Sequence, residues 1–485
     1  MHMDAVFIEE GIINLMLPFR FNKDLFSPEF KGNKLWERAP EKNKPGLDDA
    51  FLEHVREFLT INYKEGKTDK SSCVVFGLKE GTVPFRLFAK NKVYLMSRKS
   101  FDKIEQLDSS FKLPISFDSS SFKLILHYDS GIAILHYMVK LEKTKTDSQA
   151  CLHDFIVMNY MLRLFNRQDE VYFISKNNNV TERGKASDLS DVEGVDIEIK
   201  GWRPSHLVNY LLNDIINIQS SVKKHSSFFH SSRFIPFSYV RTASPIIDEN
   251  IINTALFHLK NVYDFDYSPS SHAIKFSEDR THPFQQIYYA SSVEGSVIFN
   301  NSGNTDPEFI KVFYNTSFQK NLWVIILGLL QRSIMLQLMT NVSEISPDNH
   351  KKIKEYLRSY ARISLKALFS KISVYHQYND FYDHIKSELQ ILELQTELKE
   401  ELSELNSLQT QFHDEEEKIY GKRLNVIITF LSVLSLAQVT YAILSNTSMP
   451  LMYHFFAIGI PVLVGIISWL ILVRPDKKLS SSRKK

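Results

Sequence analysis

Two long apolar segments within the last 62 residues constrain this chain more than any other feature. Residues Leu424–Leu444 are 21 consecutive uncharged residues, and Leu451–Val473 are another 23. As helices they would reach about 31 and 34 Å, which matches a hydrocarbon core of about 30 Å. We therefore predict a helical hairpin through a membrane, with spans at 424–444 and 451–473 joined by a short external loop at 445–450.

Basic residues flank both segments and predict their orientation. Lys418, Lys422 and Arg423 precede the first span, and a basic tail at 474–485 follows the second. Because cytosolic flanks carry the excess of Lys and Arg, both ends of the chain are expected in the cytosol. The acidic N-terminus lacks a basic stretch before an apolar run, so no signal peptide is expected. The expected location is the plasma (inner) membrane, with most of the chain in the cytosol.

The overall charge and the cysteine count exclude several other classes of protein. The 58 basic and 56 acidic residues leave a net charge of only +2, so no direct binding of nucleic acid is expected. Cys73 and Cys151 are the only cysteines, and they lie far apart in sequence. This predicts neither a disulfide framework nor a cysteine-based zinc site, and no metal site is predicted elsewhere.

Residues 1–305 alternate between strand and helix patterns, which predicts a cytosolic α/β sensor domain. The clearest element is Phe122–Leu141, where two β-branched runs surround Asp129-Ser130-Gly131, a hairpin signal. Further strands are predicted at 73–78, 171–175, 195–199, 234–240 and 286–290, and helices at 49–59, 150–165 and 206–221.

Residues 306–423 are predicted to form a helical stalk, because 348–420 contain neither Gly nor Pro. The apolar run Leu322–Leu330 is only nine residues long, which favours a buried core helix over a third span. Apolar residues at a 3-4 spacing predict a coiled-coil seam that packs against another helix. The seam consists of Ile391, Leu394, Leu398, Leu402, Leu405, Leu408 and Phe412.

The exposed face of this last stalk helix is acidic, with ten acids against three lysines from Lys386 to Lys418. If copies assemble around an axis, the run of acids would form a cytosolic vestibule that enriches cations. A solvated acidic face is the alternative. Only Gly421 separates the stalk from the first span, so one helix is expected to continue through the membrane. The acidic run is Asp414, Glu415, Glu416 and Glu417.

This order of parts resembles the CorA family of divalent-cation channels. Local matches are the KRLN sequence at Lys422–Asn425, Tyr441 near the end of the first span, and Met449-Pro450 in the loop. They cover about the last 110 residues, and the first 300 carry no family motif. The resemblance implies a homo-oligomer, a pentameric funnel in the lipid bilayer, with Mg²⁺ as a permeant or regulatory ion.

The chain departs from the family at its selectivity motif. Where the family has Tyr-Gly-Met-Asn, this chain has Tyr441, Ala442, Ile443 and Leu444, so the asparagine ring is lost. Asn446 would supply a substitute amide only if the helix continues past Leu444. Residues Ser445–Met452 contain no acid that would attract a hydrated divalent cation. Housekeeping uptake of Mg²⁺ is therefore not expected.

A projection at 100° per residue predicts one pore-lining side of the first span. Its cytosolic end would form apolar rings that close by dewetting, and hydroxyl rings above would contact partly hydrated ions. Close packing of helices is the alternative role of the two serines. The predicted lining consists of Leu424, Ile428, Ser432, Ser435, Val439, Ala442 and Asn446.

No motif of the common catalytic sites occurs, so an enzyme is not expected. His127 and His136 on the predicted hairpin are interpreted as structural. Some CorA-like proteins accompany type III CRISPR antiviral systems and respond to nucleotide second messengers, and this chain resembles such a member. A nucleotide site needs cations beside an aromatic ring, and two loops offer them. One loop contains Lys200, Trp202 and Arg203, and the other contains Lys223, Lys224, Phe228 and Arg233.

Three functions therefore stay open after the sequence has been read. The first is an ion channel gated by a nucleotide second messenger, which permeabilises the membrane in antiviral defence. The second is a Mg²⁺ or Co²⁺ transporter regulated by cytosolic divalent cations. The third is a membrane anchor that conducts no ions and carries a binding domain.

Overall fold

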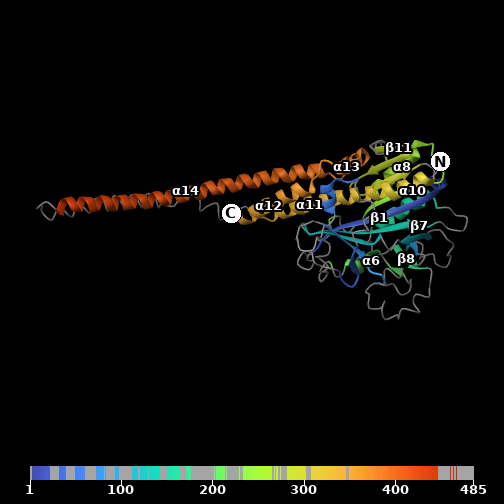
Figure 1. Cartoon of the computed structure of the whole chain (residues 1–485), viewed down its shortest axis with the longest axis horizontal. Helices are drawn as coiled ribbons and strands as arrows, with labels where there is room; N and C mark the ends of the chain where they lie inside the picture. Colours follow the sequence, from blue (N-terminus) through green and yellow to red (C-terminus); the bar gives the residue numbers. More distant parts are fainter. Residues whose placement is uncertain are drawn as a thin grey trace. The chain divides into compact units, whose positions relative to one another are not determined.

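The computed structural model of this chain is mixed α/β, as the sequence predicts (Figure 1). It describes residues 3–21, 32–39, 50–59, 73–80, 93–97, 112–117, 121–142, 150–163, 171–175, 201–215, 233–264, 281–301, 307–345 and 349–445, with small gaps inside some ranges and single residues elsewhere. It divides into two compact units. The first comprises Met1–Glu344 and Leu357–Lys399, and the second Ile345–Tyr356 and Glu400–Lys485.

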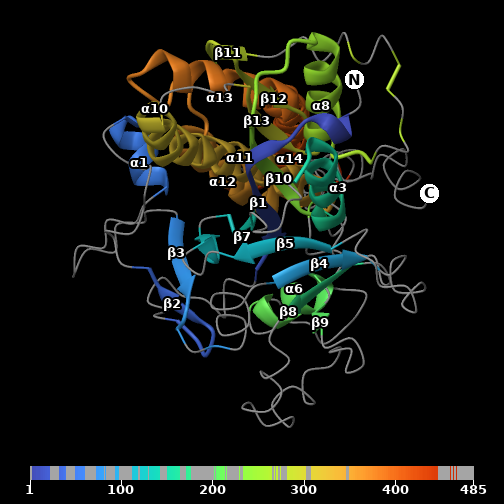
Figure 2. The ribbon, with the colours of Figure 1, turned by 90° about the vertical axis from the view of Figure 1, so that its right-hand side faces the viewer.

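The described strands form one sheet of 13 strands in the first unit (Figure 2). Its main order is β11-β12-β13-β10-β1-β7-β5-β4-β8-β9, and β6, β3 and β2 extend it from a branch at β7. Among these strands only β10 and β13 pair in parallel. The bounds are β1 Ile8–Arg20, β2 Trp36–Arg38, β3 Cys73–Leu78, β4 Val93–Ser97, β5 Lys112–Phe117, β6 Lys123–His127, β7 Ile132–Leu141, β8 Val171–Ser175, β9 Gly201–Trp202, β10 Ile235–Thr242, β11 Thr281–Phe284, β12 Ile287–Ser291 and β13 Ser296–Asn300.

Helices cover both faces of the sheet around β1. On β10, Ser238 donates a hydrogen bond to Asn159 of α3, whereas the ring of its neighbour Phe237 stacks on Phe318 of η6. Because successive strand residues point to opposite faces, α3 and η6 lie on opposite sides of the sheet. The bounds are η1 Met3–Ala5, α1 Glu53–Leu59, α3 Leu152–Arg163, α6 Pro204–Leu212, α8 Glu249–Asn261, α10 Pro307–Val312, η6 Phe313–Phe318, α11 Gln319–Ser343, α12 His350–Ala367, α13 His376–Glu388 and α14 Ile391–Ser445.

Several predicted elements are confirmed, with small shifts at their ends. The hairpin forms between β6 and β7, with Gly131 in the left-handed conformation that its turn requires. Strands β3 and β8 have the predicted bounds, whereas the strand predicted at 195–199 lies outside the described residues. Helices α1 and α3 begin later than predicted, because Phe51 and Cys151 just before them pair in isolated β-bridges.

Helix α11 is a buried core helix, as the run Leu322–Leu330 predicts. Every residue of this run is buried, and the helix packs beneath β1 and β7. Gly328 allows the close approach of α13, because a Cβ there would lie 2.7 Å from Ile385. This burial explains why residues from 307 to 343, expected in the stalk, share the first unit with the sheet.

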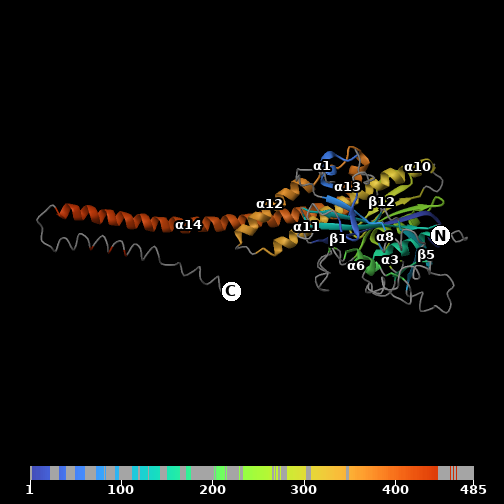
Figure 3. The same ribbon diagram turned by 60° about the horizontal axis from the view of Figure 1, so that its bottom comes forward.

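Helix α14 continues unbroken through 55 residues, or about 80 Å, which confirms one helix past Gly421 (Figures 1 and 3). Its predicted seam is buried at Ile391, Leu398, Leu402 and Leu405, whereas Leu394 and Leu408 are half-buried. The side chain of Phe412 lies outside the described residues. The seam residues in the first part of α14 are therefore mostly buried, and Ile391 lies near Gly328 of α11.

Candidate pore helix

The first predicted span lies within α14, and none of its described residues is buried. By length and composition, two helices in the described part of the chain could cross a membrane. In the most apolar 18 residues of the helix Glu308–Ser343, 78% are buried, so this helix belongs to the core, whereas in Glu417–Val439 none are buried. The second predicted span, Leu451–Val473, is described only at single positions such as Leu463 and Ile466, which are helical and exposed.

The described residues of the predicted lining side are all exposed. Leu424, Ile428 and Val439 are more than half exposed, and Ser432, Ser435 and Ala442 are exposed as well. The hydroxyl of Ser432 donates to the carbonyl of Ile428, at 2.8 Å. Its lone pairs still face away from the helix, where they could accept or coordinate. Asn446 lies outside the described residues.

The only partial cover on the described part of this span lies on the other side. Val426, Thr429, Val433 and Ala437 are half-exposed and recur at a spacing of three and four residues. At 100° per residue, this stripe is centred about 150° around the helix from the predicted lining. Among the described residues, the predicted lining side is therefore more exposed than the opposite side.

The altered family motif lies in the last turn of α14. Tyr441 and Ala442 are exposed, and the side chains of Ile443 and Leu444 lie outside the described residues. The helix continues one residue past Leu444, to Ser445, whose hydroxyl donates to the carbonyl of Ala442 at 3.0 Å.

The four acids of the predicted vestibule point in different directions. Asp414, Glu415 and Glu417 are exposed, and the side chain of Glu416 lies outside the described residues. On the helical projection, Asp414 and Glu417 lie within about 45° of the lining side, whereas Glu415 lies about 145° away. Only part of the acidic run therefore shares the side of Leu424.

The predicted ligand loops are described at few positions. Trp202 pairs through its backbone with Phe173, and Arg233 is exposed just before β10. Burial, with a contribution from the charge of Arg233, lowers the pKa of nearby Arg163 to about 10. Arg163 donates to the Val262 carbonyl and pairs with Glu294. The side chains of Lys200, Trp202, Arg203, Lys223, Lys224 and Phe228 lie outside the described residues.

The two histidines of the hairpin do not meet, and each has its own buried partner. Lys123 stands opposite His136 in the register and Ile132 opposite His127. The ring of His127 lies 2.7 Å from the Ser130 hydroxyl, and that of His136 lies 2.9 Å from the Asn14 amide oxygen. Both side chains thus have structural environments, in line with the sequence interpretation.

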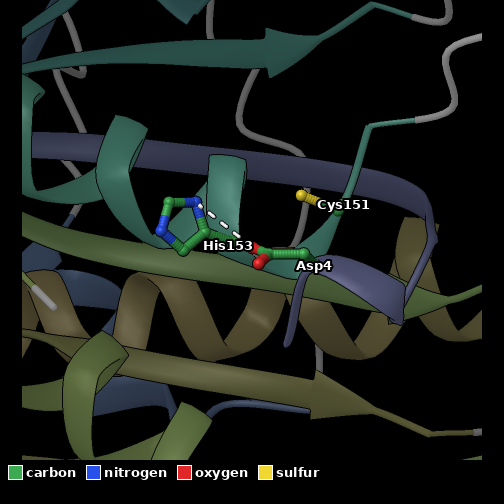
Figure 4. Close-up of side chains that lie close together, drawn as sticks. All are labelled: Asp4, Cys151 and His153. Carbon is green, nitrogen blue, oxygen red and sulfur yellow. Dashed lines mark ion pairs between the residues drawn. The ribbon is translucent and has the colours of Figure 1, made fainter. Parts of the chain in front are cut away.

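The structure brings together a group of possible metal ligands that the sequence analysis did not predict. Asp4, Cys151 and His153 each offer one ligand atom, and these atoms lie within 4.8 Å of one another (Figure 4). Asp4 comes from η1, and the other two lie at the start of α3. The spacing Cys-x-His is a weak sequence signal, and its aspartate lies about 150 residues away.

The chain was also compared with known proteins. No protein-family model, no curated protein and no solved structure matches it.

Proposed function

We propose that this chain is a subunit of a homo-oligomeric, CorA-like ion channel, a pentamer in the plasma (inner) membrane. The α/β unit senses a cytosolic ligand, and the C-terminal part of α14 lines the pore. The observation that carries the proposal is α14, one helix with a buried seam at its start and an uncovered apolar surface at its end. An apolar helix surface of this length is stable only in lipid or against other helices.

Side chains of α14 just before the span support the proposed position of the membrane boundary. Tyr420 is 65% exposed, and the guanidinium of Arg423 lies 6.0 Å above its ring. Aromatic and basic side chains are typical of the interface between lipid and water. With Lys418 and Lys422 nearby, they support a span that begins at Leu424 and a cytosolic location of both chain ends.

The start of α14 offers a route by which the first unit could move the span. Ile391 is buried, and a Cβ added to Gly328 of α11 would lie 4.0 Å from it. Arg332 of α11 donates to the carbonyl of Leu389 at the end of α13, which fastens the turn into α14. A ligand that favours one arrangement of these helices would shift the span between closed and open states.

Assembly of several copies is supported by two complementary charged helix faces. Lys351, Lys354 and Arg358 share the exposed side of α12, opposite its buried Ile353 and Tyr356. The acids Glu393, Glu397, Glu400 and Glu404 recur on one exposed side of α14. The structure gives neither set an ion pair with any residue that it describes. The proposal pairs the basic face of one subunit with the acidic face of the next.

The ligand in this proposal is a nucleotide second messenger, and the channel permeabilises the membrane as an antiviral effector. Support comes from the size of the α/β unit and from the exposed Arg233 beside Arg163. The altered motif at Tyr441–Leu444 favours regulated permeability over selection of Mg²⁺. A Mg²⁺ or Co²⁺ transporter and a non-conducting anchor are the alternatives.

Ion flux from liposomes that contain the purified full chain tests the proposal. Flux is measured without addition, with Mg²⁺, and with a panel of cyclic and adenylated nucleotides, after protein orientation has been determined. Flux that requires a nucleotide supports the proposal. Flux controlled by Mg²⁺ alone supports the transporter, and silence in every condition supports the anchor.

A matched pair of variants tests the pore axis in the same assay. Glu417→Lys reverses a charge on the predicted lining side and should reduce cation flux, because it repels cations at the cytosolic entrance. Glu415→Lys makes the same change about 145° around the helix and should have a much smaller effect. Equal effects of the two variants would remove the vestibule from the model.

A further inference from the structure

We propose that Asp4, Cys151 and His153 form a binding site for a transition-metal ion, with Zn²⁺ the preferred ion. The site is independent of the proposed channel function. It joins a carboxylate, a thiol and an imidazole from two segments about 150 residues apart. Figure 4 shows the Asp4 carboxylate between the His153 ring and the Cys151 sulfur.

The backbone holds the two segments of this site in register. Phe7 and Cys151 form a β-bridge, and two hydrogen bonds flank it. Ile8 donates to Ala150 at 2.9 Å, and Leu152 donates to Val6 at 2.8 Å. Cys151 also stands just before α3, where its backbone N–H donates to Asp154 at 3.2 Å. Main-chain pairing therefore holds the segment after Asp4 beside Cys151 and the start of α3, before any ion is bound.

The distances are within reach of tetrahedral coordination. Zn²⁺ binds sulfur at about 2.3 Å and nitrogen or oxygen at about 2.0–2.2 Å, so its ligand atoms lie about 3.3–3.8 Å apart. Here Nδ1 of His153 already lies 3.8 Å from the Asp4 carboxylate. All three ligand atoms lie within 4.8 Å of one another, so they must close by about 1 Å to bind an ion. The side chains of Asp4 and His153 are 70% and 35% exposed, which leaves room for this movement.

The charges around the thiol favour a dication over a bare thiolate. The thiol lies 3.1 Å from the Asp154 carboxylate, and the carboxylate of Asp4 belongs to the same group of ligand atoms. The same two carboxylates that disfavour a thiolate attract a metal cation.

The donor set identifies the class of ion. Sulfur and imidazole ligands select Zn²⁺ and similar transition metals, whereas Mg²⁺ and Ca²⁺ take oxygen ligands. Asp154 adjoins the sulfur and is the nearest oxygen donor for a fourth position. An ion here would clasp the segment before β1 to the start of α3.

Metal titration of the full chain tests the site. The protein is purified in detergent without a histidine tag, stripped with a chelator, and titrated with Co²⁺ and Zn²⁺. The expected result is one ion per chain, with a sulfur-to-cobalt charge-transfer band that Zn²⁺ removes and millimolar Mg²⁺ does not. Absence of the band, or removal of the band by Mg²⁺, would overturn the proposal.

Variants assign the ligands and control for misfolding. Cys151→Ser should abolish the band, and Asp4→Asn and His153→Ala should each weaken Zn²⁺ binding by about tenfold or more. Cys73→Ser changes the other, buried cysteine and should leave binding intact. In the unaltered chain, Zn²⁺ should also protect Cys151 from alkylation. Retained binding in Cys151→Ser, or no protection, would contradict the assignment even if one variant folded poorly.

Discussion

At the scale of residues, hydrogen bonds between buried polar side chains join helices of the first unit. Gln331 of α11 is fully buried, and its amide nitrogen lies 2.8 Å from the hydroxyl of Tyr382 on α13. The same hydroxyl lies 3.0 Å from the amide oxygen of Gln331 and 3.3 Å from the carbonyl of Phe369. A buried amide that loses such a partner keeps the full cost of its lost hydration.

Removal of this hydroxyl should therefore destabilise the first unit. We expect Tyr382→Phe to lower the free energy of unfolding by about 1–3 kcal/mol. Tyr375→Phe, at a ring that is 55% exposed just before the same helix, should change it by less than about 0.5 kcal/mol. Urea unfolding of the full chain in detergent measures both values. Equal values would show that the buried network contributes nothing.

His136 should make the stability depend on pH. Burial, with the charge of Lys123, lowers its pKa from 6.5 to about 3. The unfolded chain therefore binds a proton below about pH 6.5 that the folded chain binds only near pH 3. The contribution of neutral His136 is complete above pH 6.5 and is lost as the pH falls between these values, by at most about 1.4 kcal/mol per pH unit.

The comparison of pH 7 with pH 5 isolates this contribution. The unaltered chain should lose about 1–2 kcal/mol more than His136→Gln, which keeps a partner for Asn14 without a titrating group. His258, whose pKa burial also lowers, remains in both proteins and cancels in the difference. The measurement is urea unfolding at the two pH values. A loss of the same size in both proteins would exclude His136 as its cause.

Residue patterns predicted local structure better than they predicted contacts between residues far apart in sequence. The histidines of the hairpin lie on strands, as the local pattern predicts, and each ring has its own buried partner. The site at Asp4, Cys151 and His153 was missed because a β-bridge, which no local pattern encodes, brings Asp4 to α3. A count of two cysteines argues against a cysteine-rich metal site, but one thiol with an imidazole and a carboxylate needs only one.

At the scale of elements, helices and strands with a strong hydrophobic periodicity were predictable from the sequence. A strand that is buried on both faces lacks this periodicity and was missed. The hairpin at β6 and β7 and the helices from 348 on follow from their patterns. The central strand β1 was not predicted, because helices cover both of its faces and its apolar residues do not alternate with polar ones. Gly11 and Pro18 within β1 also suggest an interruption of the strand. In the structure, Gly11 allows the close approach of Phe155 of α3, because a Cβ at this position would clash with its ring.

The lining side of α14 can be tested with two neighbouring isoleucines. Ile428 and Ile427 are 51% and 55% exposed in one chain, and their directions differ by about 100°. In the proposed channel, Ile428→Ser makes the apolar constriction polar, so ion flux without ligand should rise about tenfold or more. Ile427→Ser points away from the axis and should leave basal flux nearly unchanged. Flux from liposomes is the readout, and leakage that is equal in the two variants would place the pore elsewhere.

At the scale of the whole molecule, the boundary between the two compact units does not coincide with the boundary that the sequence predicts. The sequence places a boundary near residue 305, where strands give way to helices, but α11 and α13 pack with the sheet and belong to the first unit. Composition marks a change of secondary structure, whereas a unit is defined by what its helices cover. The second unit comprises Ile345–Tyr356, with the start of α12, and Glu400–Lys485, with α14 from Glu400 on.

Charge reversal tests the proposed assembly. Lys351→Glu, Lys354→Glu and Arg358→Glu together place like charges opposite the acids of the next α14, so the oligomer should dissociate at lower dilution. Exposed ion pairs are worth about 0.2–1 kcal/mol each, so three of them predict a change of about tenfold in the dissociation constant between subunits. Glu393→Lys, Glu397→Lys and Glu400→Lys should weaken assembly in the same way.

The decisive protein combines both sets of reversals, because it restores the pairing with exchanged signs. We expect its oligomers to recover toward those of the unaltered chain, and added salt to weaken assembly in the unaltered and combined proteins alike. Mass photometry of the full chain in detergent follows the subunit count against dilution, and circular dichroism checks that each variant keeps its helices. Recovery requires that the basic face of one subunit contacts the acidic face of another. A combined variant that stays dissociated would show that α12 and α14 do not pair between copies.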